Sequence, residues 1–179
     1  MSKNCVRPTT HPEATPNTTL PPTPTYNSSV LADTAYLHHL KLLHASTSHS
    51  AAFKDACVLG RVWLRQRGFT SNIASGGIGN FEWSALMAYL MMTGGAMGGA
   101  VLAGGYSNYQ LFKGTLQFLA TRDLIKNPLV VNGVYDGIPG SDTPILVDGE
   151  LGLNIFFKMS LWAYRMVDIQ CAPLHIFSS

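Results

Sequence analysis

The sequence has few charged residues and a nearly balanced charge. Of its 179 residues, 12% are charged and the formal net charge is +2. The charged share is about half that of an average soluble protein. A net charge this small does not by itself favour nucleic-acid binding. Any basic binding surface must therefore be local.

Cysteines are also scarce, and their spacing excludes the common cysteine-based sites. Cys5, Cys57 and Cys171 contain no CxxC pair and no metal-ligand spacing. An odd number of widely separated cysteines predicts free, structural thiols in a reducing compartment. The N-terminus lacks the apolar run of a signal peptide.

No catalytic or metal-binding motif is complete. The sequence has no GxSxG and no HExxH, and the glycine-rich loop 75–79 lacks the lysine of a phosphate-binding loop. Adjacent or five-spaced histidines do not make an i, i+4 ligand pair on a helix. This spacing excludes a two-histidine metal site on one helix face. The histidines concerned are His38, His39, His44 and His49.

One acidic pair resembles the magnesium-binding arrangement of nucleotidyltransferases. Ser141 is followed by Asp148 and Glu150, but Pro144 and the β-branched run after it do not allow the intervening helix. Asp148 is instead predicted to begin a hairpin turn. We therefore predict no catalytic residue, no metal and no cofactor.

Hydrophobic periodicity and capping signals predict four helices, over residues 30–45, 53–68, 81–92 and 107–123. The last of these opens with Ser107 and Gln110 in a capping box. Shorter β-rich runs follow at 129–131, 145–147 and 153–157, and a short helix at 160–169. The fold class is therefore mainly α (α+β): a helical bundle with a C-terminal β-hairpin.

We divide the chain into three parts. Residues 1–28 hold six of the ten prolines and predict a disordered or extended Pro/Thr-rich lead-in. A Pro/Thr recognition segment is the alternative for these residues. Residues 29–127 form the predicted helical domain. Residues 128–179 carry the hairpin and the short helix, and are expected to open a further, truncated domain.

The helix predicted over 53–68 has a basic stripe. Its apolar face consists of Phe53, Ala56, Cys57, Gly60, Trp63 and Leu64. Lys54, Arg61 and Arg65 fall together on another face. With Arg67 and Lys113 they form a predicted basic patch for RNA phosphate. A solvated helix face, or a patch buried against a neighbouring domain, is the alternative.

A long uncharged stretch raises the possibility of a membrane helix. No charged residue occurs between Glu82 and Lys113. However, its dense apolar part is short, and the glycines at 94, 95, 98 and 99 disfavour a helical span. A buried core helix followed by a glycine-rich loop over 94–105 is the favoured prediction.

Three segments resemble the Nrap family of nucleolar RNA-associated proteins. They are residues 53–68, residues 79–88 and residues 105–124, the last containing the run Tyr-Ser-Asn-Tyr-Gln-Leu-Phe-Lys. Residues 144–148 and 152–159 resemble the continuation of the family sequence. The resemblance covers roughly residues 20–170.

The resemblance implies a helical domain similar to those of poly(A) polymerase and oligoadenylate synthetase, followed by the start of a nucleotidyltransferase-like domain. It further implies a non-catalytic scaffold of the small-subunit processome in the nucleolus, acting in ribosome biogenesis and pre-rRNA processing. The partners would be pre-ribosomal RNA and processome proteins. The enzymatic alternative is the helical substrate-binding half of an active nucleotidyltransferase.

Overall fold

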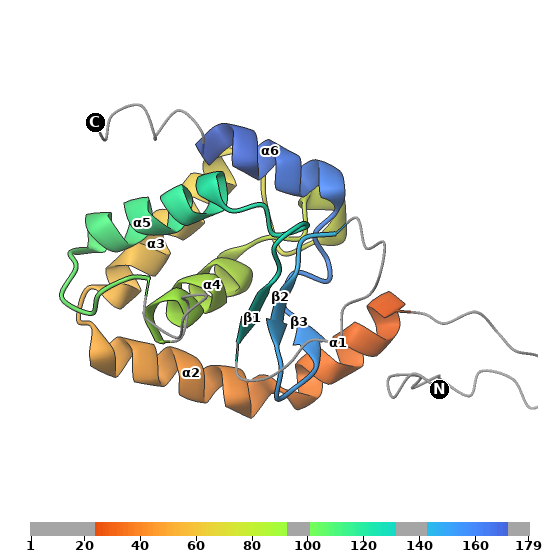
Figure 1. The fold of residues 1–179 in the computed structure, drawn as a ribbon, viewed down its shortest axis with the longest axis horizontal. Helices are drawn as coiled ribbons and strands as arrows, with labels where there is room; N and C mark the ends of the chain where they lie inside the picture. The colour runs from red at the N-terminus through yellow and green to blue at the C-terminus, as the bar shows by residue number, and fades with distance from the viewer. Residues whose placement is uncertain (1–23, 93–100, 132–142, 172–179) are drawn as a thin grey trace, which may run out of the picture.

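The computed structural model describes residues 24–92, 101–131 and 143–171, and these form a helical layer beside a small sheet (Figure 1). The predicted lead-in over 1–28 lies outside the described residues up to residue 23, and from Pro24 onward it is helical instead of disordered or extended. Most of the predicted glycine-rich loop over 94–105 also lies outside the described residues, which resume at residue 101. The fold class predicted from the sequence is confirmed. The elements are the helices α1 (Pro24–Thr34), α2 (Tyr36–His49), α3 (Phe53–Gln66), α4 (Asn80–Met92), α5 (Asn108–Thr121) and α6 (Leu161–Cys171), the 3-10 helix η1 (Ile73–Ser75), and the strands β1 (Leu129–Val131), β2 (Leu146–Asp148) and β3 (Leu153–Asn154).

Helix α4 is the centre of the core. Every residue from Glu82 to Met91 is buried, and α2, α3 and α5 all contact this helix (Figure 1). A helix that is apolar all round is stable only when its whole surface is covered. The Met-rich segment is therefore the predicted core helix. Among the helices of the described residues, none has both the length and the apolar character needed to cross a bilayer.

Helices α3 and α5 pack side by side over α4. The Trp83 ring of α4 lies 6.2 Å from the Trp63 ring of α3 and 5.8 Å from the Phe112 ring of α5, measured between centroids. Glycine at Gly60 permits this approach, because a Cβ there would overlap the Trp83 indole. The aromatic contacts thus fix three helices against one another.

The sheet has the order β1–β2–β3. Strand β1 pairs with β2 in parallel, and β2 pairs with β3 antiparallel, which forms the predicted hairpin. The side chain of Asn154 braces the hairpin, accepting hydrogen bonds from the backbone N–H groups of Leu146 and Phe156. Helix α6 then packs on α5, and the Tyr164 hydroxyl links the two by donating to the carbonyl of Arg122.

Of two helices predicted from the sequence, one agrees with the structure in its capping and the other differs in its bounds. The capping box of α5 is present as predicted, with Ser107 and Gln110 bonded reciprocally. The single helix expected over 30–45 is instead two helices that begin at Pro24 and break at Ala35 (φ −81°, ψ 0°). Proline is favoured in a first helical turn. Thr34, directly before the break, donates its hydroxyl to the carbonyl of Leu31.

Candidate nucleic-acid interface

The predicted basic stripe lies on the outer face of α3. Phe53, Trp63 and Leu64 are buried on the inner face of α3. The residues on the opposite face, at positions 54, 61 and 65, therefore point toward solvent. Lys54 and Arg61 are exposed, as is Arg65, which follows Arg61 by one turn. Within the described residues, none of these three cations forms an ion pair. Their charge is therefore available to an external anion.

Arg61 and Arg65 share a hollow of about 320 Å³ with the start of α4. The remaining lining residues are Leu64, Phe69, Thr70, Ser71, Gly79 and Asn80. The Thr70 hydroxyl and the Asn80 side-chain amide can donate hydrogen bonds to a phosphate oxygen, as the two guanidinium groups can. The hollow is thus a polar, positively charged depression at the junction of α3 and α4.

An internal carboxylate already occupies the positive end of α4. Glu82 is 3% exposed, and its Oε2 accepts hydrogen bonds from the Ser71 hydroxyl at 2.7 Å and from the Gly79 N–H at 2.9 Å. This carboxylate offsets the positive charge of the helix N-terminus. Attraction for an anion in the hollow therefore comes from Arg61 and Arg65.

The other two predicted site residues do not line this hollow. The Arg67 guanidinium stacks on the Trp63 ring at 4.3 Å and donates to Gln170 Oε1 at 3.3 Å, so it turns toward α6. Lys113 is half-buried on α5. Of the five predicted residues, the structure brings Arg61 and Arg65 together in the hollow, with Lys54 further along the same helix face.

Sequence reasoning missed a buried polar cluster that joins three elements. Asp148 of β2 is fully buried, and its Oδ2 accepts a hydrogen bond from the Tyr89 hydroxyl of α4 at 2.6 Å. His38 Nε2 of α2 lies 2.9 Å from the same oxygen. Burial, and then the bond to Asp148, raise the pKa of Tyr89. The phenol therefore stays protonated and donates to the carboxylate.

The acidic pair considered from the sequence does not converge on a metal site. Asp148 is buried, while Glu150 is exposed and donates its backbone N–H to Asp148 Oδ1 at 3.1 Å. This is the predicted turn after β2. No cluster of three or more metal-ligating side chains occurs among the residues that the structure describes.

The described cysteines are poor nucleophiles. Cys57 and Cys171 are both free. Burial raises the pKa of the Cys57 thiol, and it raises the pKa of Cys171 to about 12. A protonated thiol is unreactive compared with the thiolate. Both cysteines thus have the environment of structural core residues.

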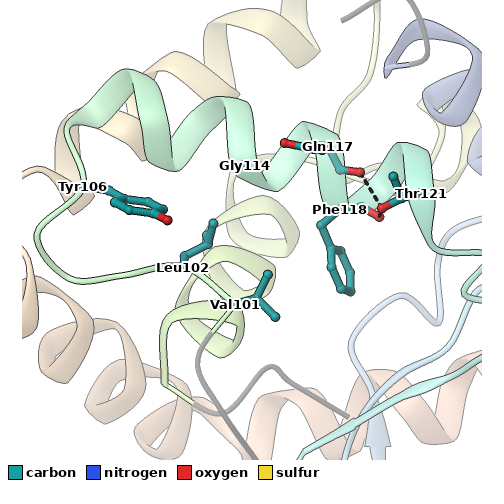
Figure 2. A pocket seen from close by; sticks show the side chains of 7 residues that line it. All are labelled: Val101, Leu102, Tyr106, Gly114, Gln117, Phe118 and Thr121. Atoms are coloured by element: carbon teal, nitrogen blue, oxygen red, sulfur yellow. Dashed lines mark hydrogen bonds between the residues drawn. The ribbon is translucent and has the colours of Figure 1, made fainter. Parts of the chain in front are cut away.

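A second hollow, of about 280 Å³, lies beside α5 (Figure 2). It is lined by Val101, Leu102, Tyr106, Gly114, Gln117, Phe118 and Thr121. The Thr121 hydroxyl donates to the backbone carbonyl of Gln117 at 2.8 Å, so it is already engaged. Few polar groups converge here, and the arrangement lacks the charge found at the α3 hollow.

Comparisons with known proteins match two parts of the chain to domains of one family. Residues 52–173 match a family domain described as the Nrap protein PAP/OAS-like domain, and residues 1–49 match Nrap protein domain 1. The U3 small nucleolar RNA-associated protein 22 of Saccharomyces cerevisiae is 37% identical over 183 residues, or 93% of this chain and 14% of the relative. Its Schizosaccharomyces pombe counterpart is 37% identical over 85% of this chain and 14% of its own length. Nucleolar protein 6 of Homo sapiens is 37% identical over 76% of this chain and 11% of its own length. The chain thus spans a small part of each of these relatives.

Proposed function

Since this chain belongs to the Nrap family, we propose that it serves ribosome biogenesis in the nucleolus as a non-catalytic scaffold of the small-subunit processome. The observation that carries the proposal is the 37% identity, over 93% of this chain, to a protein named for its association with U3 small nucleolar RNA. Pre-ribosomal RNA and processome proteins are the proposed partners.

Association with the U3 particle is tested by purification from nucleoli. The full chain, tagged and expressed in yeast, is recovered from a nucleolar extract, and U3 small nucleolar RNA is quantified against an abundant spliceosomal RNA. We expect selective enrichment of the U3 RNA. Recovery of the two RNAs in the same ratio as in the extract would contradict the proposed role.

The scaffold role includes a direct RNA contact, which we assign to the α3 face. Arg61 and Arg65 support it because they share a polar hollow and have no ion-pair partner among the described residues. Lys54 extends the same face. Arg67 and Lys113 remain in the proposed patch as the sequence suggested it, although neither lines the hollow. Phosphate binding by such cations releases counterions, so the affinity must fall with salt.

The RNA contact is tested by fluorescence anisotropy with a labelled single-stranded RNA over a potassium chloride series. The double variant Arg61→Gln and Arg65→Gln should lower the slope of log affinity against log salt by about 1.4, at about 0.7 per lost phosphate contact. The double variant Lys41→Gln and Lys126→Gln, which removes two exposed lysines outside the hollow, is the charge-matched control. An unchanged slope in the double variant would remove these two residues from the interface.

The proposal of a non-catalytic role has its own test. The similarity of the PAP/OAS-like domain to polymerases supplies the rival, a substrate-binding half of an active nucleotidyltransferase. The chain is incubated with labelled nucleoside triphosphates, an RNA primer and Mg²⁺ or Mn²⁺. We expect no extension. Extension that copurifies with the chain through several columns would favour the enzyme.

A further inference from the structure

Helix α2 has two dissimilar sides. Its inner side is fastened to the rest of the fold: His38 bonds to buried Asp148 at 2.9 Å, and the His39 ring packs edge-on to Phe81 with centroids 5.1 Å apart. Buried Ser46 continues this inner side. These contacts fix which side of the helix turns outward.

The outward side carries an apolar patch at its N-terminal end. Tyr36, Leu37 and Leu40, here called the outer patch, are 61%, 68% and 44% exposed. Further along the same side the exposed residues turn polar, with Lys41 and His44. A single exposed leucine needs no explanation, but large apolar side chains gathered within one turn indicate a contact surface.

The family comparison indicates what covers this patch. Residues 1–49, which include α1 and α2, match domain 1 of the family, whereas the elements that hold the inner side of α2 match the PAP/OAS-like domain at 52–173. A domain needs packed layers around its own core. The two helices that the structure describes within residues 1–49, one of which is fastened to a different domain, do not enclose such a core.

We propose that the outer patch of α2 docks onto the body of an Nrap domain 1, so that α2 is shared between two domains. The partner surface is an apolar groove, because Tyr36 and Leu40 are spaced one helical turn apart and present adjacent anchors on one helix face. The proposal rests on family membership and not on the RNA contact at α3. Failure of the salt-dependence test at Arg61 and Arg65 would therefore leave it standing.

The test uses the full 179-residue chain and a separately produced domain 1 of the Saccharomyces cerevisiae relative, cut before the residues that align with Pro24. Circular dichroism first verifies that this domain 1 is folded, and binding is then measured by isothermal titration calorimetry. Leu37→Glu should weaken binding at least about 30-fold, the loss typical of an interface hot spot. Ile169→Glu, at an equally exposed apolar position on α6, should change it less than about 2-fold.

Several results would overturn the proposal. A folded domain 1 that does not bind, or binding that both glutamate variants weaken equally, removes the outer patch as its site. Sedimentation measures self-association of the chain alone. A dimer that Leu37→Glu abolishes would make a second copy the occupant, and would also overturn the proposal. Slowed amide exchange across α2 on adding domain 1, with α6 unchanged, supports it.

Discussion

Replacing Gly60 with alanine tests the packing of the three-helix core that displays the α3 face. Gly60 lies where α3 meets α4, and a Cβ at this position would overlap the indole of Trp83. That indole is fully buried, and its neighbours are the rings of Trp63 and Phe112. The indole therefore has no free space to enter. The overlap must be relieved by moving a helix or by an unfavourable rotamer.

The magnitude follows from two opposing contributions. Gly→Ala inside an exposed helix stabilises by about 1 kcal/mol. Overpacking a dense core costs about 1–3 kcal/mol, and the enclosed Trp83 ring places Gly60→Ala at the upper end. The free energy of unfolding should therefore fall by about 2 kcal/mol, which lowers the melting temperature by about 4–8 °C in a chain of this size.

Urea unfolding, followed by far-ultraviolet circular dichroism and by tryptophan fluorescence, measures this loss. Gly105→Ala is the matched control, since a Cβ on Gly105 would meet no atom within 4 Å. The control should leave stability unchanged or raise it by up to about 1 kcal/mol. A Gly60→Ala protein as stable as the parent, with the same dependence on urea, would refute the reasoning.

Three further predictions concern buried titratable groups. Tyr89→Phe removes a hydrogen-bond donor from buried Asp148 and should lower the free energy of unfolding by about 1–3 kcal/mol. Urea unfolding measures this loss, and an unchanged free energy of unfolding would contradict the cluster. Burial lowers the pKa of His39 from 6.5. Below about pH 6.5 the unfolded chain protonates His39 while the folded chain keeps it neutral. The stability contributed by neutral, buried His39 is therefore present above about pH 6.5 and is lost as the pH falls. His39→Phe should reduce the drop in urea midpoint between about pH 7.5 and 5.5, and an equal drop in both proteins would contradict this. Cys171, whose pKa burial raises to about 12, should escape iodoacetamide at about pH 8 until urea is added, as mapped by peptide mass spectrometry. Labelling of native Cys171 at the rate of a free thiol would contradict its burial.

Local signals predicted most of the helices because their causes are short-range. Ser107 and Gln110 identify the start of α5 through a cap that spans three residues. The apolar spacing around Trp63 identified the buried side of α3. Helical geometry then places the cations on the opposite, exposed side. The break at Ala35 was missed because neither proline nor glycine marks it in the sequence.

The candidate site was predictable only in part, because burial and pairing depend on contacts between distant segments. Helical phase placed Arg61 and Arg65 on one face, but the hollow they share requires the α4 start to pack beside them. Phase alone does not reveal that Arg67 stacks on Trp63. The sequence carries one sign of the cluster at Asp148: this acid directly follows the apolar run Ile145–Leu146–Val147 of a buried strand.

The meeting of His38 and Tyr89 at one carboxylate has a consequence for the order in which the chain folds. Its three participants come from α2, α4 and β2, and the first and last of them lie near opposite ends of the described chain. Closing so long a loop costs entropy before the contact gives any gain, so we expect the bond to form late in folding, after the rate-limiting step. Tyr89→Phe should therefore speed unfolding and leave the refolding rate nearly unchanged. On this expectation the bond between Tyr89 and Asp148 slows unfolding of the native state without speeding its formation.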